Sequence, residues 1–135
     1  MEETALVLSA KMGKWYWSNP LRVERDRPTY RRYLPLLRAI AQAGWRPLTL
    51  ARSNRQDLWV ERFGEGETVY LTLLNAGDQR HLATIALDPR LGLTSGARAR
   101  ELLSGSAVPW RKQAGLLAFD LWLAPEEVRV VRIGR

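Results

Sequence analysis

The chain has 135 residues, 46% of them apolar and 26% charged, which is the composition of one globular domain. This length excludes a (β/α)8 barrel, which needs about 250 residues, but it allows a hydrophobic core without covalent cross-links. Cysteine is absent, which excludes disulfides, thiolate metal sites and cysteine nucleophiles. The single histidine, His81, has no second imidazole with which to share a metal, so we expect no metal and no cofactor.

The net charge of +7 lies entirely in the first part of the chain. Residues 1–55 carry eleven basic and four acidic side chains, whereas residues 56–135 carry ten of each. A basic segment of this kind binds polyanions or faces an acidic partner. An arginine preference that reflects genome composition or a hot habitat, without any ligand, explains the same excess.

The N-terminus lacks the basic start and the apolar run of a signal peptide. No stretch approaches the ~18 apolar residues of a membrane span. We therefore expect a soluble chain without a membrane partner, located in the cytoplasm if the chain is complete.

Residues 28–44 have the apolar spacing of an amphipathic helix, with repeats of three and four positions. Asp26 is a suitable N-cap and Pro28 fits the first turn. Gly44 suits the left-handed position that ends a helix. The preceding residues, 1–27, are expected to form an N-terminal arm or an added strand.

From about residue 57 the apolar period changes to two, which is typical of half-buried strands. Turn residues separate six such runs, at 57–63, 68–75, 81–87, 98–103, 116–123 and 127–133. Regularly spaced short strands of this kind predict an antiparallel β-sandwich. We therefore expect one mainly-β domain over 1–135, with a jelly-roll or immunoglobulin-like Greek-key sandwich at 57–133 and the helix packed on it.

Several segments of the β-rich half occur in a familiar order. They are WVERFG at 59–64, YLTLLN at 70–75, ATIALD at 83–88, ELLSG at 101–105 and LAPEEVRVVR at 123–132. This succession resembles the C-terminal β-sandwich that follows the catalytic barrel in many glycoside hydrolases. Residues 33–47 resemble the last barrel helix and its exit into that sandwich.

The resemblance implies an accessory domain, similar to a carbohydrate-binding module, which either holds a catalytic barrel domain or subunit or contacts carbohydrate. The barrel and its catalytic carboxylates are absent from this chain, so no active-site residue carries over. Within the chain, carboxylate pairs for glycoside cleavage would be Glu61 with Asp120, or Asp57 with Glu61. Surface salt bridges explain these residues better, so we expect no catalytic residue.

Aromatic residues are the most informative candidates for binding, because the chain has six tryptophans. In an extended segment Trp15 and Trp17, on either side of Tyr16, would point to one side about 6.6 Å apart along the strand. Two rings in line form a platform for the C–H faces of a sugar chain. Alternatively, they dock the N-terminal segment onto the rest of the domain.

Trp122 alternates with the core residues of its strand, so it shares the other face with Asp120. That face is either open to ligand or covered by the helix at 28–44, and covering is the more economical interpretation. Trp110 lies in a loop beside two basic residues and is the best candidate for an exposed aromatic. Trp45 is expected to pack back on the last helical turn.

Nucleic-acid binding would use the basic residues around Trp15 and Trp17. Glu24 and Asp26 interrupt these positive charges, and no known nucleic-acid-binding motif or phosphate-binding loop is present. We therefore predict a non-catalytic carbohydrate-binding or accessory module that recognises polysaccharide. The predicted ligand-binding residues are Trp110, Trp15, Trp17, Tyr16, Trp122 and Asp120. The alternatives are a structural domain that packs against a glycoside hydrolase barrel, and a basic polyanion-binding module.

Overall fold

The structure is a computed structural model that describes residues 20–94 and 96–135. The chain divides into two compact units, residues 1–39 and 40–135. The predicted aromatic platform of Trp15, Tyr16 and Trp17 lies outside the described residues.

The helix α3 spans Pro20–Ala43 and therefore begins earlier than the predicted start at residue 28. Residues 20–27, expected in an arm or a strand, are helical, and both Pro28 and Pro35 lie inside the helix. A proline inside a helix loses one backbone hydrogen bond and crowds the carbonyl four residues back, yet the helix here continues through both positions, so Pro28 does not mark its start. The predicted end is confirmed: Gly44 has φ +82°, and its N–H donates to the Ile40 carbonyl at 3.0 Å.

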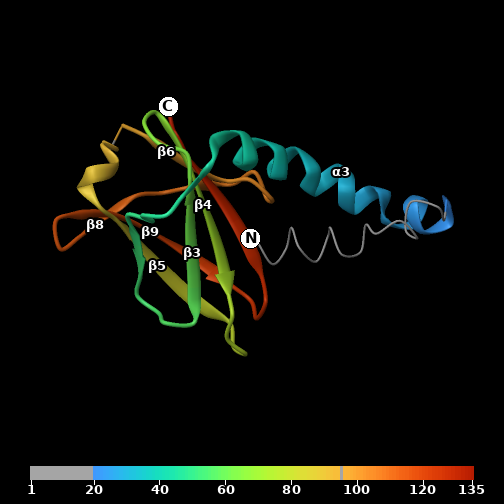
Figure 1. Ribbon diagram of the computed structural model, residues 1–135. Coiled ribbons are helices and arrows are strands. Elements are labelled where there is room, and N and C mark those ends of the chain that lie inside the picture. Colours follow the sequence, from blue (N-terminus) through green and yellow to red (C-terminus); the bar gives the residue numbers. More distant parts are fainter. Residues whose placement is uncertain (1–19, 95) are drawn as a thin grey trace. The chain divides into compact units, whose positions relative to one another are not determined.

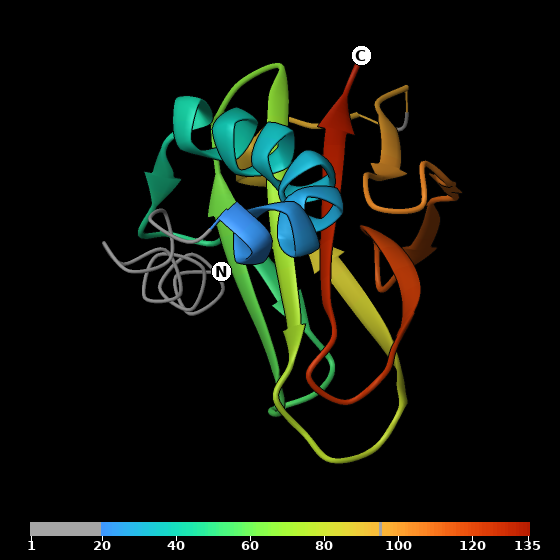
Figure 2. The ribbon, with the colours of Figure 1, turned by 90° about the vertical axis from the view of Figure 1, so that its right-hand side faces the viewer.

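Residues 40–135 form a sandwich of two antiparallel sheets, which confirms the mainly-β prediction (Figures 1 and 2). The six-stranded sheet has the order β1 (Trp45–Arg46), β3 (Leu58–Phe63), β4 (Thr68–Asn75), β10 (Val128–Gly134), β6 (Arg98–Glu101) and β7 (Ala107–Val108). The four-stranded sheet has the order β2 (Ala51–Ser53), β5 (His81–Leu87), β9 (Leu116–Leu123) and β8 (Arg111–Gln113). A short 3-10 helix, η1 (Pro89–Leu91), follows β5.

The six predicted strands are present, within a residue or two at their ends. The sequence did not predict the short strands β1, β2, β7 and β8, nor η1. Strands of two or three residues are too short to display a period. In addition, all three residues of β8 are exposed, so they carry no apolar signal.

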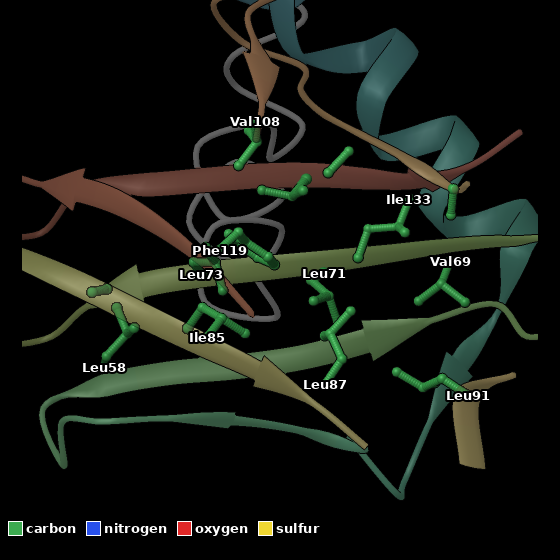
Figure 3. Packing of buried hydrophobic residues seen from close by; sticks show 14 of the residues in the cluster. Leu58, Val69, Leu71, Leu73, Ile85, Leu87, Leu91, Val108, Phe119 and Ile133 are labelled. Atoms are coloured by element: carbon green, nitrogen blue, oxygen red, sulfur yellow. The ribbon is translucent and has the colours of Figure 1, made fainter. Parts of the chain in front are cut away.

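The core lies between the two sheets, where alternate side chains of the long strands meet (Figure 3). Leu71 and Leu73 of β4 point inward from one sheet, and Ile85 of β5 and Phe119 of β9 point inward from the other. All four side chains are fully buried. This arrangement leaves each sheet a second, outer face, and these two faces carry the candidate sites.

The ELLSG segment forms a buried polar junction at the end of β6. The Glu101 carboxylate is 2% exposed and accepts hydrogen bonds from the backbone N–H groups of Leu103 and Ser104, at 2.9 and 2.7 Å. The Ser104 hydroxyl also donates to it, and Arg129 of β10 lies 3.2 Å away. Burial raises the pKa of Glu101, but the hydrogen bonds from Ser104 and Leu103 and the charge of Arg129 outweigh it, so the pKa is lowered. Glu101 thereby ties β6, its following turn and β10 together.

We predict that Glu101→Gln lowers the free energy of unfolding by about 2–4 kcal/mol at neutral pH, because charged hydrogen-bond partners lose their carboxylate. The lowered pKa means that Glu101 stabilises the fold fully above the ordinary glutamate pKa of about 4.3, and loses this effect as pH falls through its folded pKa. Urea unfolding between pH 7 and pH 3 should therefore show a weaker acid dependence in the variant than in the parent. Glu67→Gln, at an exposed position, is the control, and equal acid dependence in both variants would contradict this role of Glu101.

Candidate functional site

The candidate site is the outer face of the four-stranded sheet, which we call the Trp122 face. In the β5–β9 register, Leu82 lies opposite Trp122, Thr84 opposite Asp120 and Ala86 opposite Ala118. These residues alternate with the buried core residues of the same strands, so their side chains point away from the core. The prediction that Trp122 and Asp120 share one face is confirmed.

An aromatic residue lies at one end of this face and is open to solvent. Trp122 is 51% exposed and Leu82 beside it is 42% exposed. The expectation that the helix at 28–44 covers this face stays a prediction, because residues 1–39 and 40–135 are separate units. The guanidinium of Arg80 lies over the Trp122 ring, with its carbon 4.4 Å from the ring centroid, as in a cation–π contact.

The loop that carries Arg80 is held in place by the buried side chain of Asn75. Its Nδ2 donates to the carbonyls of Gln79, at 2.8 Å, and Leu123, at 3.1 Å, while its Oδ1 accepts from the Gly77 N–H at 2.9 Å. Gln79 and Leu123 are the direct chain neighbours of Arg80 and Trp122. One amide therefore fixes both partners of the cation–π contact relative to each other.

A second set of contacts supports the same loop. Asp57 lies 3.2 Å from His81 Nε2 and accepts a hydrogen bond from Arg55 Nε, also at 3.2 Å. A Cβ atom at Gly77 would lie 2.5 Å from Asp57 Oδ2, so a larger residue there would push the Asp57 carboxylate aside. Glycine at residue 77 thus lets the loop backbone pack directly against Asp57 in this cluster.

A polar network occupies the centre of the Trp122 face. Arg111 of β8 donates to both carboxylate oxygens of Asp120, from Nε at 2.7 Å and from Nη2 at 3.1 Å. The Thr84 hydroxyl donates to Asp120 Oδ1 at 2.6 Å. The hydrogen bonds from Arg111 and then Thr84 lower the pKa of Asp120, so its carboxylate is charged at neutral pH. The centre of the face thus presents an oriented guanidinium and carboxylate to solvent.

A groove of about 420 Å³ lies toward the opposite end of β5 and β9 from Trp122. Leucines 48, 50 and 116 contribute apolar walls, and Arg52 lies on the same side of the sheet as Ala86. Leu50 has φ +53°, an uncommon conformation for a residue other than glycine. The face therefore runs from an aromatic end, across a polar centre, to a groove with mixed walls.

Trp110 is partly buried, so the expectation that it is exposed is wrong, while its predicted role in ligand binding stays a prediction. Its ring packs against the core and meets Phe119 edge to face, with ring centroids 5.7 Å apart. Its indole N–H donates to the Ala97 carbonyl at 2.7 Å. A half-buried indole with its N–H paired within the domain has a structural role in holding the β7–β8 loop on the sandwich.

The expectation for Trp45 is also wrong, because this residue belongs to β1, opposite Phe63 of β3, and is 58% exposed. Trp59 of β3 is 54% exposed and was missed by the sequence reasoning. Both tryptophans lie on the outer face of the six-stranded sheet, as do Phe63, Tyr70 and Leu74. The alternation of apolar residues in β3 could have predicted that Trp59 points outward, because it lies between the inward-facing Leu58 and Val60.

The candidate catalytic pairs are not brought together. Glu61 lies on the outer face of the six-stranded sheet and Asp120 on the outer face of the other sheet, so the sandwich separates them. Asp57 lies in the turn before β3, where its carboxylate contacts Arg55 and His81, whereas Glu61 points to the outer face of the six-stranded sheet. Across residues 20–94 and 96–135, no group of three His, Asp or Glu side chains is placed to hold a metal ion. The helix described by the structure is not apolar enough to cross a membrane.

Comparison with known proteins gave structural matches only. No protein-family model matches the chain, and no curated protein does. Among solved structures, a GH27 β-L-arabinopyranosidase from Geobacillus stearothermophilus is 21% identical, with a TM-score of 0.42, over 63% of this chain and 19% of that enzyme. A GH42 β-galactosidase from G. stearothermophilus is 17% identical, with a TM-score of 0.41, over 82% of this chain and 13% of that enzyme.

A third match is an enzyme from Bacillus halodurans described as a putative α-N-acetylgalactosaminidase. It is 18% identical, with a TM-score of 0.42, over 63% of this chain and 20% of that protein. The chain is thus structurally similar to portions of GH27 and GH42 glycoside hydrolases. It spans a fifth or less of the length of the solved structures described here.

The different surroundings of two tryptophans predict different effects on stability. Trp110→Ala should lower the free energy of unfolding by about 2–4 kcal/mol, because it leaves a cavity beside Phe119 and an unpaired carbonyl at Ala97. Trp122→Ala should change it by less than about 1 kcal/mol, because that ring is half in solvent. Urea unfolding followed by circular dichroism measures both values, and the reverse order would contradict these assignments.

Proposed function

We propose that this chain is a non-catalytic carbohydrate-binding module that binds polysaccharide on the Trp122 face. The observation that carries the proposal is a half-exposed tryptophan on an open sheet face, next to an oriented Arg111–Asp120 pair. An aromatic ring binds the C–H face of a sugar, and neighbouring charged groups bind its hydroxyls. Of the residues predicted from the sequence, Trp122 and Asp120 remain in this proposal.

The expected affinity is weak, because one ring and a few hydrogen bonds contact the glycan. Dissociation constants of about 10 µM to 1 mM correspond to roughly −4 to −7 kcal/mol. Stacking releases no counterions, so binding should change little with salt. Nucleic-acid binding by the basic segment would instead weaken steeply between about 50 and 200 mM salt.

We predict that Trp122→Ala abolishes retention on polysaccharide, because removing the ring eliminates the stacking surface. The measurement is a pull-down on a panel of insoluble neutral and acidic polysaccharides at 50 and 200 mM salt. Trp59→Ala is the matched control, since Trp59 is exposed to nearly the same extent on the other sheet, at 54% against 51%. This variant should bind like the parent.

Three outcomes contradict the proposal. Retention on polysaccharide that survives Trp122→Ala would show that the Trp122 face is not the binding site. Absence of retention on every glycan would contradict the carbohydrate-binding function. Retention on single-stranded DNA alone, at low salt alone, would favour the polyanion-binding alternative.

A second candidate function is a domain that packs against a glycoside hydrolase barrel through the outer face of the six-stranded sheet. The observation that favours it is the pair of exposed tryptophans, Trp45 and Trp59, on that face. Moreover, Glu61 Oε2 on the same face is buried without a hydrogen-bond partner in the described part of the chain. Such an oxygen is costly unless another segment supplies a donor. This function predicts that Trp59→Ala and Trp45→Ala, rather than Trp122→Ala, weaken association with a barrel domain.

A further inference from the structure

The Trp122 face carries positive charge that the described protein does not neutralise. Asp120 pairs with Arg111, Asp88 pairs with Arg90 at 2.9 Å, and the charge of Arg52 also acts on Asp88. Within residues 20–94 and 96–135, Arg80 forms no ion pair. Arg80 therefore adds a positive charge without an ion-pair partner at the Trp122 end of the face, although residues 56–135 as a whole carry no net charge.

Arg80 is the arginine best prepared to bind an anion. Its guanidinium carbon lies 4.4 Å from the centroid of the Trp122 ring, and within residues 20–94 and 96–135 its N–H donors have no hydrogen-bond or ion-pair partner. The loop behind it is anchored by Asn75 through the carbonyl of Gln79. Little entropy is lost when such a pre-oriented group binds, and the planar fork of N–H donors matches a carboxylate.

The same contact places a sugar-stacking surface and an anion-binding group side by side. Arg80 covers one face of the indole, yet half of the Trp122 surface stays accessible. Because the Arg80 guanidinium carbon is only 4.4 Å from the ring centroid, a sugar that contacts the accessible part of Trp122 lies within reach of that guanidinium. A neutral sugar would leave these donors to water, whereas a sugar with a carboxylate would pair with them.

We infer that the glycan bound on the Trp122 face is acidic, with uronic acid residues whose carboxylate pairs with Arg80. This inference rests on the proposed carbohydrate-binding function and specifies its ligand class. It makes Arg80 a specificity-determining residue and Trp122 the stacking residue. The single ion pair adds a shallow salt dependence, much weaker than that of a nucleic-acid complex.

The test compares each acidic polysaccharide with its own methyl ester, which removes the charge and retains the sugar rings. The probes are polygalacturonate, alginate and glucuronoxylan, titrated by isothermal calorimetry into the full chain. At least one acid should bind about tenfold more tightly than its ester, because only the acid forms a charged hydrogen-bonded pair with Arg80. Arg80→Gln should remove this preference and bring the acid to the affinity of the ester.

One variant separates the geometry of the Arg80 guanidinium from its charge, and a second tests whether the position of the arginine matters. Arg80→Lys keeps the charge without the planar fork and should retain part of the preference. Arg98→Gln removes an exposed arginine from the other sheet and should leave the preference unchanged. Thermal melting of each variant checks that the fold is intact.

Each outcome decides one of the two proposals. Equal binding of acids and esters, or a preference that survives Arg80→Gln, would overturn the acidic-glycan inference while the carbohydrate-binding function stands. Tight binding of a neutral polysaccharide, with no binding of any acid, would do the same. No binding of any glycan, neutral or acidic, would overturn the carbohydrate-binding function itself.

Discussion

The candidate site depends on one buried side-chain amide, that of Asn75. It is 1% exposed and bonds three backbone groups, two in the β4–β5 loop and one at the end of β9. Buried amide groups must be satisfied in this way, because an unpaired one costs about 1–3 kcal/mol. Here the hydrogen bonds also set the relative position of the β4–β5 loop and the end of β9. That position brings the backbone on either side of the Arg80–Trp122 contact close together, so the Arg80 side chain can reach the ring.

The two outer faces of the sandwich differ because different side chains alternate with the core residues. On the four-stranded sheet the outward residues are small or polar in the centre, with Ala86, Ala118 and the Thr84–Asp120 pair. On the six-stranded sheet they are aromatic and aliphatic toward β1, where Trp45 and Trp59 are exposed. The two faces therefore differ in chemistry, because one presents a single ring beside polar groups and the other presents exposed tryptophans near β1.

Periodicity predicted the long strands and the outward direction of Trp122 and Asp120, because alternation of period two is a local property. It did not predict the partners of these residues. Arg111 comes from a three-residue strand without an apolar pattern, and Arg80 comes from a loop positioned by Asn75. Trp110 was misjudged for a related reason: its acceptor, Ala97, is thirteen residues away, and nothing in the loop sequence indicates that hydrogen bond. The predicted helix start failed because Pro28 was given more weight than the helix-compatible residues before it.

The most direct test of binding on the Trp122 face is an NMR titration that follows the indole N–H signals of the tryptophans. Polygalacturonate oligosaccharides are added to uniformly labelled protein, and each indole signal is assigned by a single tryptophan variant. The account predicts that the Trp122 signal and the backbone signals of Arg80 and Leu82 shift with saturation. The signals of Trp59 and of Trp110, whose N–H is held by Ala97, should stay in place. Shifts confined to Trp45 and Trp59, with none at Trp122, would contradict the account.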